Sequence, residues 1–222
     1  PLLTDLSRSY QSIRVLAEKY AEAGYHVLRF DYSGTGDSFG EWRNAGPGRW
    51  VKDIAKAAEE LGEISGAESM TLLGIRFGAL LALHAAAELN PQSLLLWDPM
   101  SDGRSYRSSL DRIHSSLVDL HIGLSKSEMQ QAENESCGFE LVPWMTDDLV
   151  NFPAPQHLPD SVENIKLVRT IGITAFSDIE DRWQREGRKI TCRQIDFDCS
   201  WDLTPEAILN PSPVLKELAS CQ

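Results

Sequence analysis

The chain has 222 residues, of which 42% are hydrophobic and 24% are charged, and this suits one globular domain with a sizeable core. Its 33 acidic and 21 basic residues give a formal net charge of -12. An acidic surface repels phosphate backbones and anionic lipids, which argues against nucleic acid or a membrane surface as a general partner. No apolar run approaches the roughly 20 residues that span a bilayer.

The four cysteines indicate a reducing compartment. Cys137, Cys192, Cys199 and Cys221 show no CxxC spacing, and a chain of this length does not need disulfides to fold. We therefore interpret them as thiols of a cytoplasmic protein, with a Cys192–Cys199 bridge as the alternative. The chain begins at Pro1 and its first periodic segment is already a helix, so we expect upstream material that includes the first strands.

The first 98 residues predict alternating helices and strands. We expect helices over 6–23, 50–64 and 77–89, and strands over 25–30, 70–74 and 93–98. The apolar face of the first helix is expected to hold Tyr10, Ile13, Leu16, Ala17 and Tyr20, and Gly24 to end it. From residue 25 the order is strand, helix, strand, helix, strand, which predicts a parallel sheet covered on both faces.

The regular alternation of strands and helices ends after Asp98. Residues 99–166 are too long for a connection in an α/β unit, which usually takes ~2–6 residues, and we interpret them as an inserted lid with a helix near 106–121. The sheet is then expected to resume with a strand over 168–176, a helix over 179–186, a strand over 189–197 and a last helix over 212–221.

Three motifs resemble those of the α/β-hydrolase superfamily. Residues 74–78 read GIRFG between a strand and a helix, and with serine at the centre they would form the nucleophile elbow G-x-S-x-G. Residues 29–38, RFDYSGTGDS, resemble the D-x-x-G-x-G-x-S turn that precedes the elbow in many of these proteins. Residues 94–106, LLLWDPMSDGRSY, complete a combination that is most similar to the hydrolase-like proteins encoded beside exosortase A systems, which are linked to bacterial exopolysaccharide export.

This resemblance implies an α/β-hydrolase fold: a mostly parallel sheet flanked by helices, with a core of residues 1–98 and 167–222 and a lid of residues 99–166 between the third and fourth visible strands. It also implies an esterase- or thioesterase-like ancestor. The triad itself does not carry over, because Arg76 replaces the serine and no histidine follows the last strand, where the family keeps its base. The stretch Asp196–Asp202 occupies that place, and the start of the chain has no HG or GG oxyanion motif. We assign no catalytic residue, and Asp98 and Asp178 are the candidate acid positions.

Two hypotheses compete for Arg76. In the first it is a structural cation that pairs with Asp98, or with Asp178, inside the former pocket; breaking such a pair would cost several kcal/mol. In the second it binds an anionic ligand, because a guanidinium beside a helix N-terminus grips carboxylate or phosphate. The candidate ligand-binding residues are then Arg76, Phe77, Asp98 and Arg104, although Arg104 also suits a solvated helix start.

Other groups of residues give weaker evidence for a catalytic, metal or phosphate site. Ser38, Ser177 or Cys199 would serve as a displaced nucleophile only with a base within hydrogen-bond reach. The histidines at 114 and 121 lack the i, i+4 spacing of a helical metal pair, so we predict no metal site, and we expect no cofactor. The segment GTGDSFG lacks the spacing and the lysine of a phosphate loop and indicates a tight turn.

Three functional hypotheses follow. The first is a degenerate α/β-hydrolase that binds a small anionic or acyl ligand, carrier-linked or free, or a protein partner. The second is an active esterase or thioesterase with an unorthodox site. The third is a purely structural partner in a polysaccharide-export system. The first hypothesis predicts that Arg76→Ser does not restore esterase activity, since no histidine is expected near the new hydroxyl.

Overall fold

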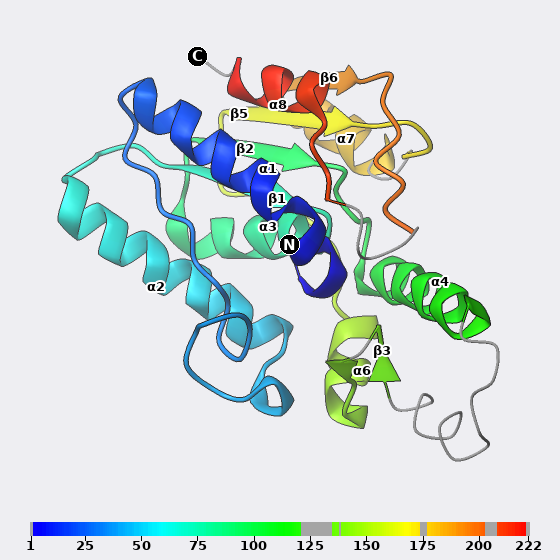
Figure 1. The fold of residues 1–222 in the computed structure, drawn as a ribbon. Coiled ribbons are helices and arrows are strands. Elements are labelled where there is room, and N and C mark those ends of the chain that lie inside the picture. The colour runs from blue at the N-terminus through cyan, green and yellow to red at the C-terminus, as the bar shows by residue number, and fades with distance from the viewer. Residues whose placement is uncertain (1, 121–134, 138, 174–176, 203–207, 221–222) are drawn as a thin grey trace.

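The computed structural model describes residues 2–120, 135–137, 139–173, 177–202 and 208–220 (Figure 1). Strands β1 (Thr71–Ile75), β2 (Ser93–Trp97), β5 (Asn164–Arg169) and β6 (Lys189–Gln194) form one sheet in the order β1-β2-β5-β6, and every pair in it is parallel. The remaining elements are α1 (Leu3–Glu22), η1 (Trp42–Asn44), α2 (Pro47–Ser65), α3 (Phe77–Leu89), α4 (Gly103–Leu120), β3 (Glu135–Ser136), β4 (Phe139–Glu140), α6 (Pro143–Val150), α7 (Ser177–Arg185) and α8 (Ser212–Ala219).

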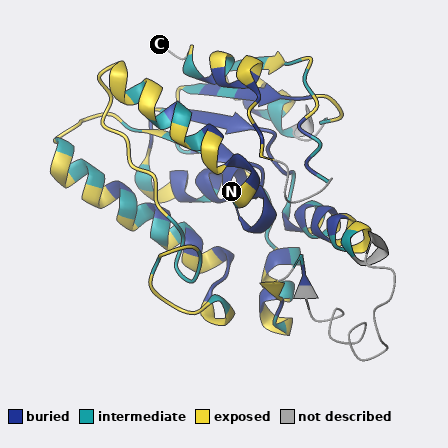
Figure 2. Cartoon of the chain, in the orientation of Figure 1, coloured by how far each residue is buried: buried dark blue, intermediate teal, exposed yellow. Residues whose placement is uncertain are grey.

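Helices cover both faces of this sheet, as the alternation of elements predicts. Alternate strand residues face opposite sides. On one side Trp97 and Val168 pack with residues of α1 and α8, such as Leu16 and Leu218. On the other side Leu96 and Leu167 pack with residues of α3 and α7. Helix α2 lies against α3, and Figure 2 shows the strands and α3 as the buried centre of the molecule.

The strand register brings two predicted site positions to one edge of the sheet. Ile75 pairs with Trp97 at the carboxyl ends of β1 and β2. The next residues, Arg76 and Asp98, therefore follow neighbouring strand ends. The prediction for α3 is confirmed at both bounds, because this apolar helix ends where Asn90 adopts a left-handed conformation before a proline.

The prediction of a strand over 25–30 is wrong. These residues are exposed, and within the described part of the chain no strand pairs with them. The β-branched and aromatic composition favours an extended chain, but a strand exists only when its backbone groups bond a neighbour. Tyr25 contacts the ring of Tyr20 edge-on, and Arg29 lies over the ring of Tyr10. The segment therefore packs on two tyrosine side chains of α1.

Two further expectations need correction. The buried face of α1 holds Asp5, Arg8, Ser9 and Ser12 together with Leu16, whereas Tyr10 is 52% exposed. The strand expected over 168–176 is β5, which runs from Asn164 to Arg169, and residues 174–176 lie outside the described ranges. The predicted core boundary at 167 therefore falls inside a strand.

The segment between β2 and β5 contains α4, β3, β4 and α6. Helices α4 and α6 meet at Gly103, where an added Cβ would lie 1.7 Å from the carbonyl oxygen of Leu149. The amide of Gly103 also donates to Phe152 O at 2.8 Å. That this segment acts as a lid stays a prediction. Across the described ranges, none of the helices combines the length and apolarity that crossing a bilayer requires.

Candidate functional site

The turn between β1 and α3 has the geometry of an elbow. Arg76 adopts φ 55° and ψ -123°, a sparsely populated conformation that costs a residue with a Cβ about 1–3 kcal/mol. Its amide donates to Trp97 O at 3.0 Å, and its carbonyl accepts from the amide of Ala79 at 3.1 Å. A Cβ on Gly74 would lie 2.4 Å from the Cα of Ala79, so only glycine lets strand and helix approach this closely. Gly74 therefore has an architectural role in this turn.

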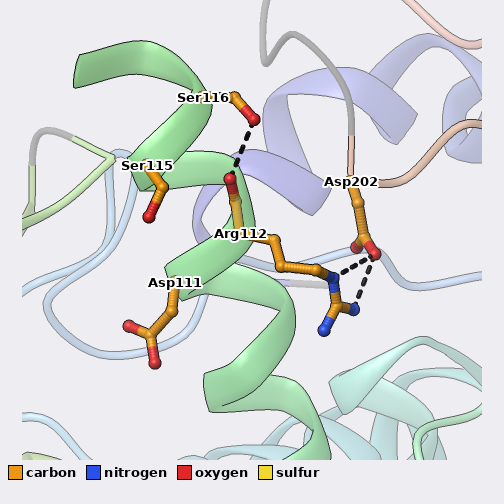
Figure 3. Close-up of a pocket in the computed structure, with 5 residues that line it drawn as sticks. All are labelled: Asp111, Arg112, Ser115, Ser116 and Asp202. Atoms are coloured by element: carbon orange, nitrogen blue, oxygen red, sulfur yellow. Dashed lines mark hydrogen bonds and ion pairs between the residues drawn. The ribbon is translucent and has the colours of Figure 1, made fainter. Parts of the chain in front are cut away.

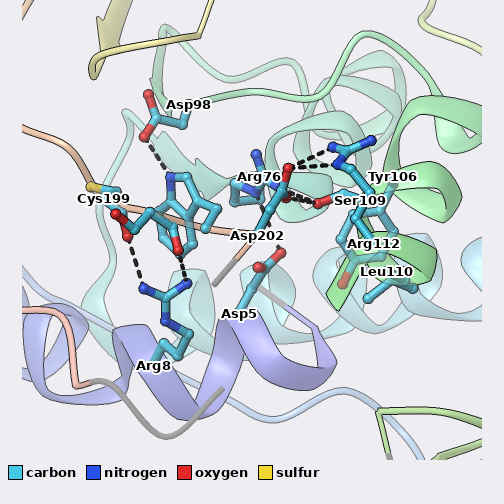
Figure 4. Close-up of polar contacts among 12 residues, drawn as sticks. Asp5, Arg8, Arg76, Asp98, Tyr106, Ser109, Leu110, Arg112, Cys199 and Asp202 are labelled. Atoms are coloured by element: carbon cyan, nitrogen blue, oxygen red, sulfur yellow. Dashed lines mark hydrogen bonds and ion pairs between the residues drawn. The ribbon is translucent and has the colours of Figure 1, made fainter. Parts of the chain in front are cut away.

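The Arg76 side chain is buried and surrounded by polar groups (Figure 4). Its Nη2 donates to the hydroxyl of Ser109 at 2.7 Å. Ion pairs join Nε to Asp5 at 3.7 Å and Nη2 to Asp202 at 3.6 Å. The guanidinium also lies 5.3 Å from the centre of the Trp201 ring, within cation–π range. The fork predicted from the sequence is thus held by side chains from α1, α4 and the segment after β6.

Asp98 is not the partner of Arg76, which corrects the first pairing that the sequence predicts. Its carboxylate accepts the amide and the hydroxyl of Thr170, each at 2.7 Å, and the indole N–H of Trp201 at 2.7 Å. Trp201 therefore contacts both Asp98 and Arg76. Burial raises the pKa of the Asp98 carboxyl, and the bonds from Trp201 and Thr170 oppose that shift. Asp98 acts as an acceptor that fixes the Trp201 ring.

The network continues from Arg76 to the surface through Asp202. Oδ1 of Asp202 accepts a hydrogen bond from the Ser109 hydroxyl, and Oδ2 accepts two from Arg112, at 2.6 and 2.9 Å. The side chain of Asp202 is 38% exposed, whereas that of Arg76 is 4% exposed. Beside this pair lies a cavity of about 440 Å³ (Figure 3), lined by Asp111, Arg112, Ser115, Ser116 and Asp202.

Helix α1 contributes two further buried charges. Asp5 lies at its first turn, and burial raises the pKa of the Asp5 carboxyl, while the Arg76 guanidinium opposes the rise. Arg8 donates to Ser200 O at 2.7 Å and to Cys199 O at 2.8 Å, so it anchors the segment after β6. Burial lowers the pKa of the Arg8 guanidinium. The first two turns of α1 therefore supply both a counter-ion, Asp5, and an anchor, Arg8, for this site.

The remaining predicted ligand residues do not gather around Arg76. Phe77 is fully buried and stacks on Tyr106, with ring centroids 4.8 Å apart, so it is a core residue. Arg104 is exposed near the start of α4, as the solvated alternative predicts. Asp178 belongs to α7, and its side chain lies outside the described part of the structure.

Two of the three candidate nucleophiles, Ser38 and Cys199, have described side chains, and neither is hydrogen-bonded to a histidine or a carboxylate among the described residues. The Ser38 hydroxyl donates to the backbone carbonyl of Asp31 inside a turn. Cys199 is 1% exposed, and burial raises the pKa of its thiol to about 12. Ser177 begins α7, and its side chain is not described. Within the described ranges, no group of three or more histidine, cysteine or acidic side chains is placed to hold a metal ion.

The described histidines are engaged or exposed away from the elbow. His84 shares a hydrogen bond with Pro153 O at 2.7 Å, and His114 Nδ1 accepts the amide of Cys137 at 3.2 Å. His157 is 82% exposed beside Glu186. His26 is exposed, and His121 lies outside the described ranges.

The sequence reasoning missed two groups of residues around the site: the Arg76 contacts Asp5, Ser109 and Trp201, and the arginines Arg8 and Arg112 that bind the segment at 199–202. A signal for Asp5 and Arg8 was present, because they recur with Ser9 and Ser12 at helical spacing and mark a polar stripe on α1. Asp202 lies in the stretch where the family keeps its base, but the sequence does not show that it reaches the elbow.

The fold, the elbow and the flanking helices define an α/β-hydrolase. A family profile described as serine aminopeptidase, S33, matches residues 4–133, more than half of the chain, and the chain belongs to this family. The palmitoyl-protein thioesterase ABHD10 of Rattus norvegicus, a mitochondrial protein, is 34% identical over 73 residues. That match covers 32% of this chain and 23% of the relative, so less than a quarter of the relative's length is matched.

Solved structures agree on the fold. Est1E of Butyrivibrio proteoclasticus, with bound ferulic acid, has a TM-score of 0.62 at 14% identity, covering 93% of this chain and 80% of Est1E. A putative hydrolase of Agrobacterium vitis has a TM-score of 0.58 at 16% identity, covering 96% of this chain and 79% of that protein. Mouse ABHD10 has a TM-score of 0.54 at 15% identity, covering 93% of this chain and 80% of that structure. The predicted fold class is confirmed.

Proposed function

We propose that this member of the α/β-hydrolase family is a binding protein without hydrolytic activity. The observation that carries the proposal is the Arg76–Asp202 ion pair of 3.6 Å. Arg76 stands at the nucleophile position of the elbow, and Asp202 stands in the stretch after the last strand where the family keeps its base. An ion pair therefore takes the place of the hydrogen bond between nucleophile and base on which acyl transfer depends.

The surroundings of Arg76 support the same proposal. A guanidinium cannot attack a carbonyl carbon, and its deprotonation is out of reach in proteins. Enzymes that lose a triad member keep only about 10³–10⁴-fold acceleration over water, from substrate binding and the oxyanion hole. Here the Arg76 side chain is buried and contacted by Asp5, Ser109 and Asp202 from three parts of the chain. We therefore propose that a ligand binds at the cavity beside Asp202.

The resemblance to proteins encoded beside exosortase A systems suggests where such a binding protein acts. We place it with exopolysaccharide export, as a carrier or partner for an anionic intermediate rather than as a catalyst. This placement rests on the motifs at residues 29–38, 74–78 and 94–106.

A second candidate is an esterase or thioesterase with an unorthodox site. One contact favours it: the Ser109 hydroxyl donates to Asp202 and accepts from Arg76 at 2.7 Å. In this arrangement the carboxylate would act as the base and the guanidinium would stabilise an oxyanion. Ser109 is 1% exposed, however, and a carboxylate that is already paired with two arginines is a weak base.

Turnover measurements separate the two candidates. Purified protein is assayed with p-nitrophenyl acetate, p-nitrophenyl butyrate and palmitoyl-coenzyme A, alongside the Arg76→Ser and Ser109→Ala variants. A binding protein gives no turnover above buffer for any of the three proteins. Turnover by the unmodified protein that Ser109→Ala abolishes would contradict the proposal and establish the second candidate.

A further inference from the structure

We infer that the Asp202 carboxylate is an internal stand-in for the anion that this protein binds, and that the ligand is a small hydrophilic carboxylate or phosphate. This inference rests on the proposed function, because it names the ligand class of the same site. Three hydrogen-bond donors converge on this carboxylate, the Ser109 hydroxyl and Nε and Nη2 of Arg112, and Nη2 of Arg76 lies 3.6 Å from it as an ion-pair partner. Two guanidiniums and a hydroxyl around one oxyanion are typical of a carboxylate or phosphate site.

The position of Asp202 makes exchange with an external anion feasible. Arg76 on the inner side is buried, but Asp202 is 38% exposed and Arg112 is 58% exposed. Both Asp202 and Arg112 line the cavity of about 440 Å³ in Figure 3. An anion that enters the cavity meets the Arg112 guanidinium first and then competes for the groups that Asp202 occupies.

The inner side of the site is not fully satisfied by the protein. Nε of Arg76 and Oδ2 of Asp5 are both buried and 3.7 Å apart, beyond hydrogen-bond range. Among the described residues neither atom has a hydrogen-bond partner. Asp202 itself stays 3.6 Å from Nη2 of Arg76, so its short side chain does not reach the buried guanidinium at hydrogen-bond distance. A free anion is not tethered to the backbone and can approach more closely.

The lining of the cavity sets the character of the rest of the ligand. Every lining residue is polar: Asp111, Arg112, Ser115, Ser116 and Asp202. The negative charge of Asp111 is compensated by Arg107, whose Nη2 lies 2.7 Å from it, so its repulsion of an incoming anion is reduced. Hydroxyls at Ser115 and Ser116 suit a hydroxylated ligand.

Removal of the stand-in followed by supply of a free anion tests this inference. The thermal midpoint of Asp202→Ala is measured while potassium acetate replaces potassium chloride at constant ionic strength, and again with potassium phosphate. We expect acetate to raise the midpoint of Asp202→Ala by several degrees more than that of the unmodified protein, because a ligand bound only to the folded state stabilises it. The added substitution Arg112→Gln should remove this response.

Glu18→Ala is the matched control, since it also deletes a carboxylate that pairs with an arginine, Arg14 at 2.8 Å, but on α1 and outside the cavity lining, and it should show no acetate response. A folded Asp202→Ala protein without an anion response would overturn the inference, while leaving the absence of turnover to be judged by the ester assays. If Asp202→Ala does not fold, Asp202→Asn keeps the shape without the charge. Calorimetry should then show phosphate binding at least tenfold tighter than in the unmodified protein; equal affinity would overturn the inference.

Discussion

Replacing Arg76 by methionine tests how far the former catalytic centre has become an ion-pair network. Methionine has a similar length and the same Cβ, so the strained backbone of the elbow is unchanged and only the charge and its donors are lost. Asp5, which is 1% exposed, would then lose its nearest counter-ion. Deletion of one partner of a buried ion pair costs about 3–5 kcal/mol, because the other charge stays buried without compensation.

The loss should depend on pH, with a sign that follows from Asp5. Burial already raises the pKa of this carboxyl, and removal of Arg76 removes the charge that opposes the rise. A carboxyl whose folded pKa exceeds its unfolded value binds its proton more tightly in the folded state, so the free energy of unfolding rises as pH falls through the folded pKa. The stability deficit of Arg76→Met should therefore be smaller in mildly acidic buffer than at neutral pH.

Urea unfolding followed by tryptophan fluorescence measures this deficit, since Trp201 lies against Arg76. We expect a loss of about 3–5 kcal/mol near neutral pH and, in a thermal scan, a midpoint lower by roughly 6–20 °C. The double variant Arg76→Met/Asp5→Asn should recover part of the loss and have no extra pH dependence. A loss below about 1 kcal/mol that is the same at both pH values would refute the reasoning.

Three further predictions concern the frame of the site. Gly74→Ala should lower the free energy of unfolding in urea by roughly 3 kcal/mol, because the new Cβ would lie 2.4 Å from the Cα of Ala79. The control Gly48→Ala, where a Cβ has no neighbour within 4 Å, should be neutral or stabilising. Equal effects of the two substitutions would contradict the close approach at Gly74. Asp98→Asn should lower the free energy of unfolding by about 1–3 kcal/mol, because the amide N–H of the asparagine would face a hydrogen-bond donor. An unchanged thermal midpoint would argue against the three hydrogen bonds that the Asp98 carboxylate accepts. The Cys199 thiol, with its pKa raised to about 12, should react with Ellman's reagent only after unfolding, and rapid reaction of the folded protein would contradict its burial.

Much of the fold follows from local patterns in the sequence. The apolar run 77–89 ends before Asn90-Pro91, and the helix has those bounds because both the packing and the C-cap agree with the local pattern. The strand at 25–30 failed because pairing is a non-local property: its composition favours an extended chain, yet no described strand lies beside it. The prediction for the buried face of α1 was wrong for a related reason, since the polar residues of this helix are buried by partners far away in the sequence.

The centre of the site was predictable and its partners were not. Arg76 stands out because a motif fixes the elbow position, whatever residue occupies it. The strand order made Asp98 the expected partner of Arg76, but the Asp98 carboxylate accepts hydrogen bonds from Trp201 and Thr170 instead. Asp202 follows a segment whose backbone Arg8 binds at Cys199 and Ser200, and these contacts join residues about 190 positions apart, which local patterns do not show.

The proposed function requires that no activated nucleophile exists at the elbow. Intact-mass spectrometry after incubation with a fluorophosphonate tests it directly, because this reagent phosphonylates activated serine hydroxyls without requiring the natural substrate. We predict that the mass of the protein does not change, since Arg76 occupies the nucleophile position and is paired with Asp5 and Asp202. A one-to-one adduct on a serine, and on Ser109 above all, would show that the site is catalytic and contradict the account.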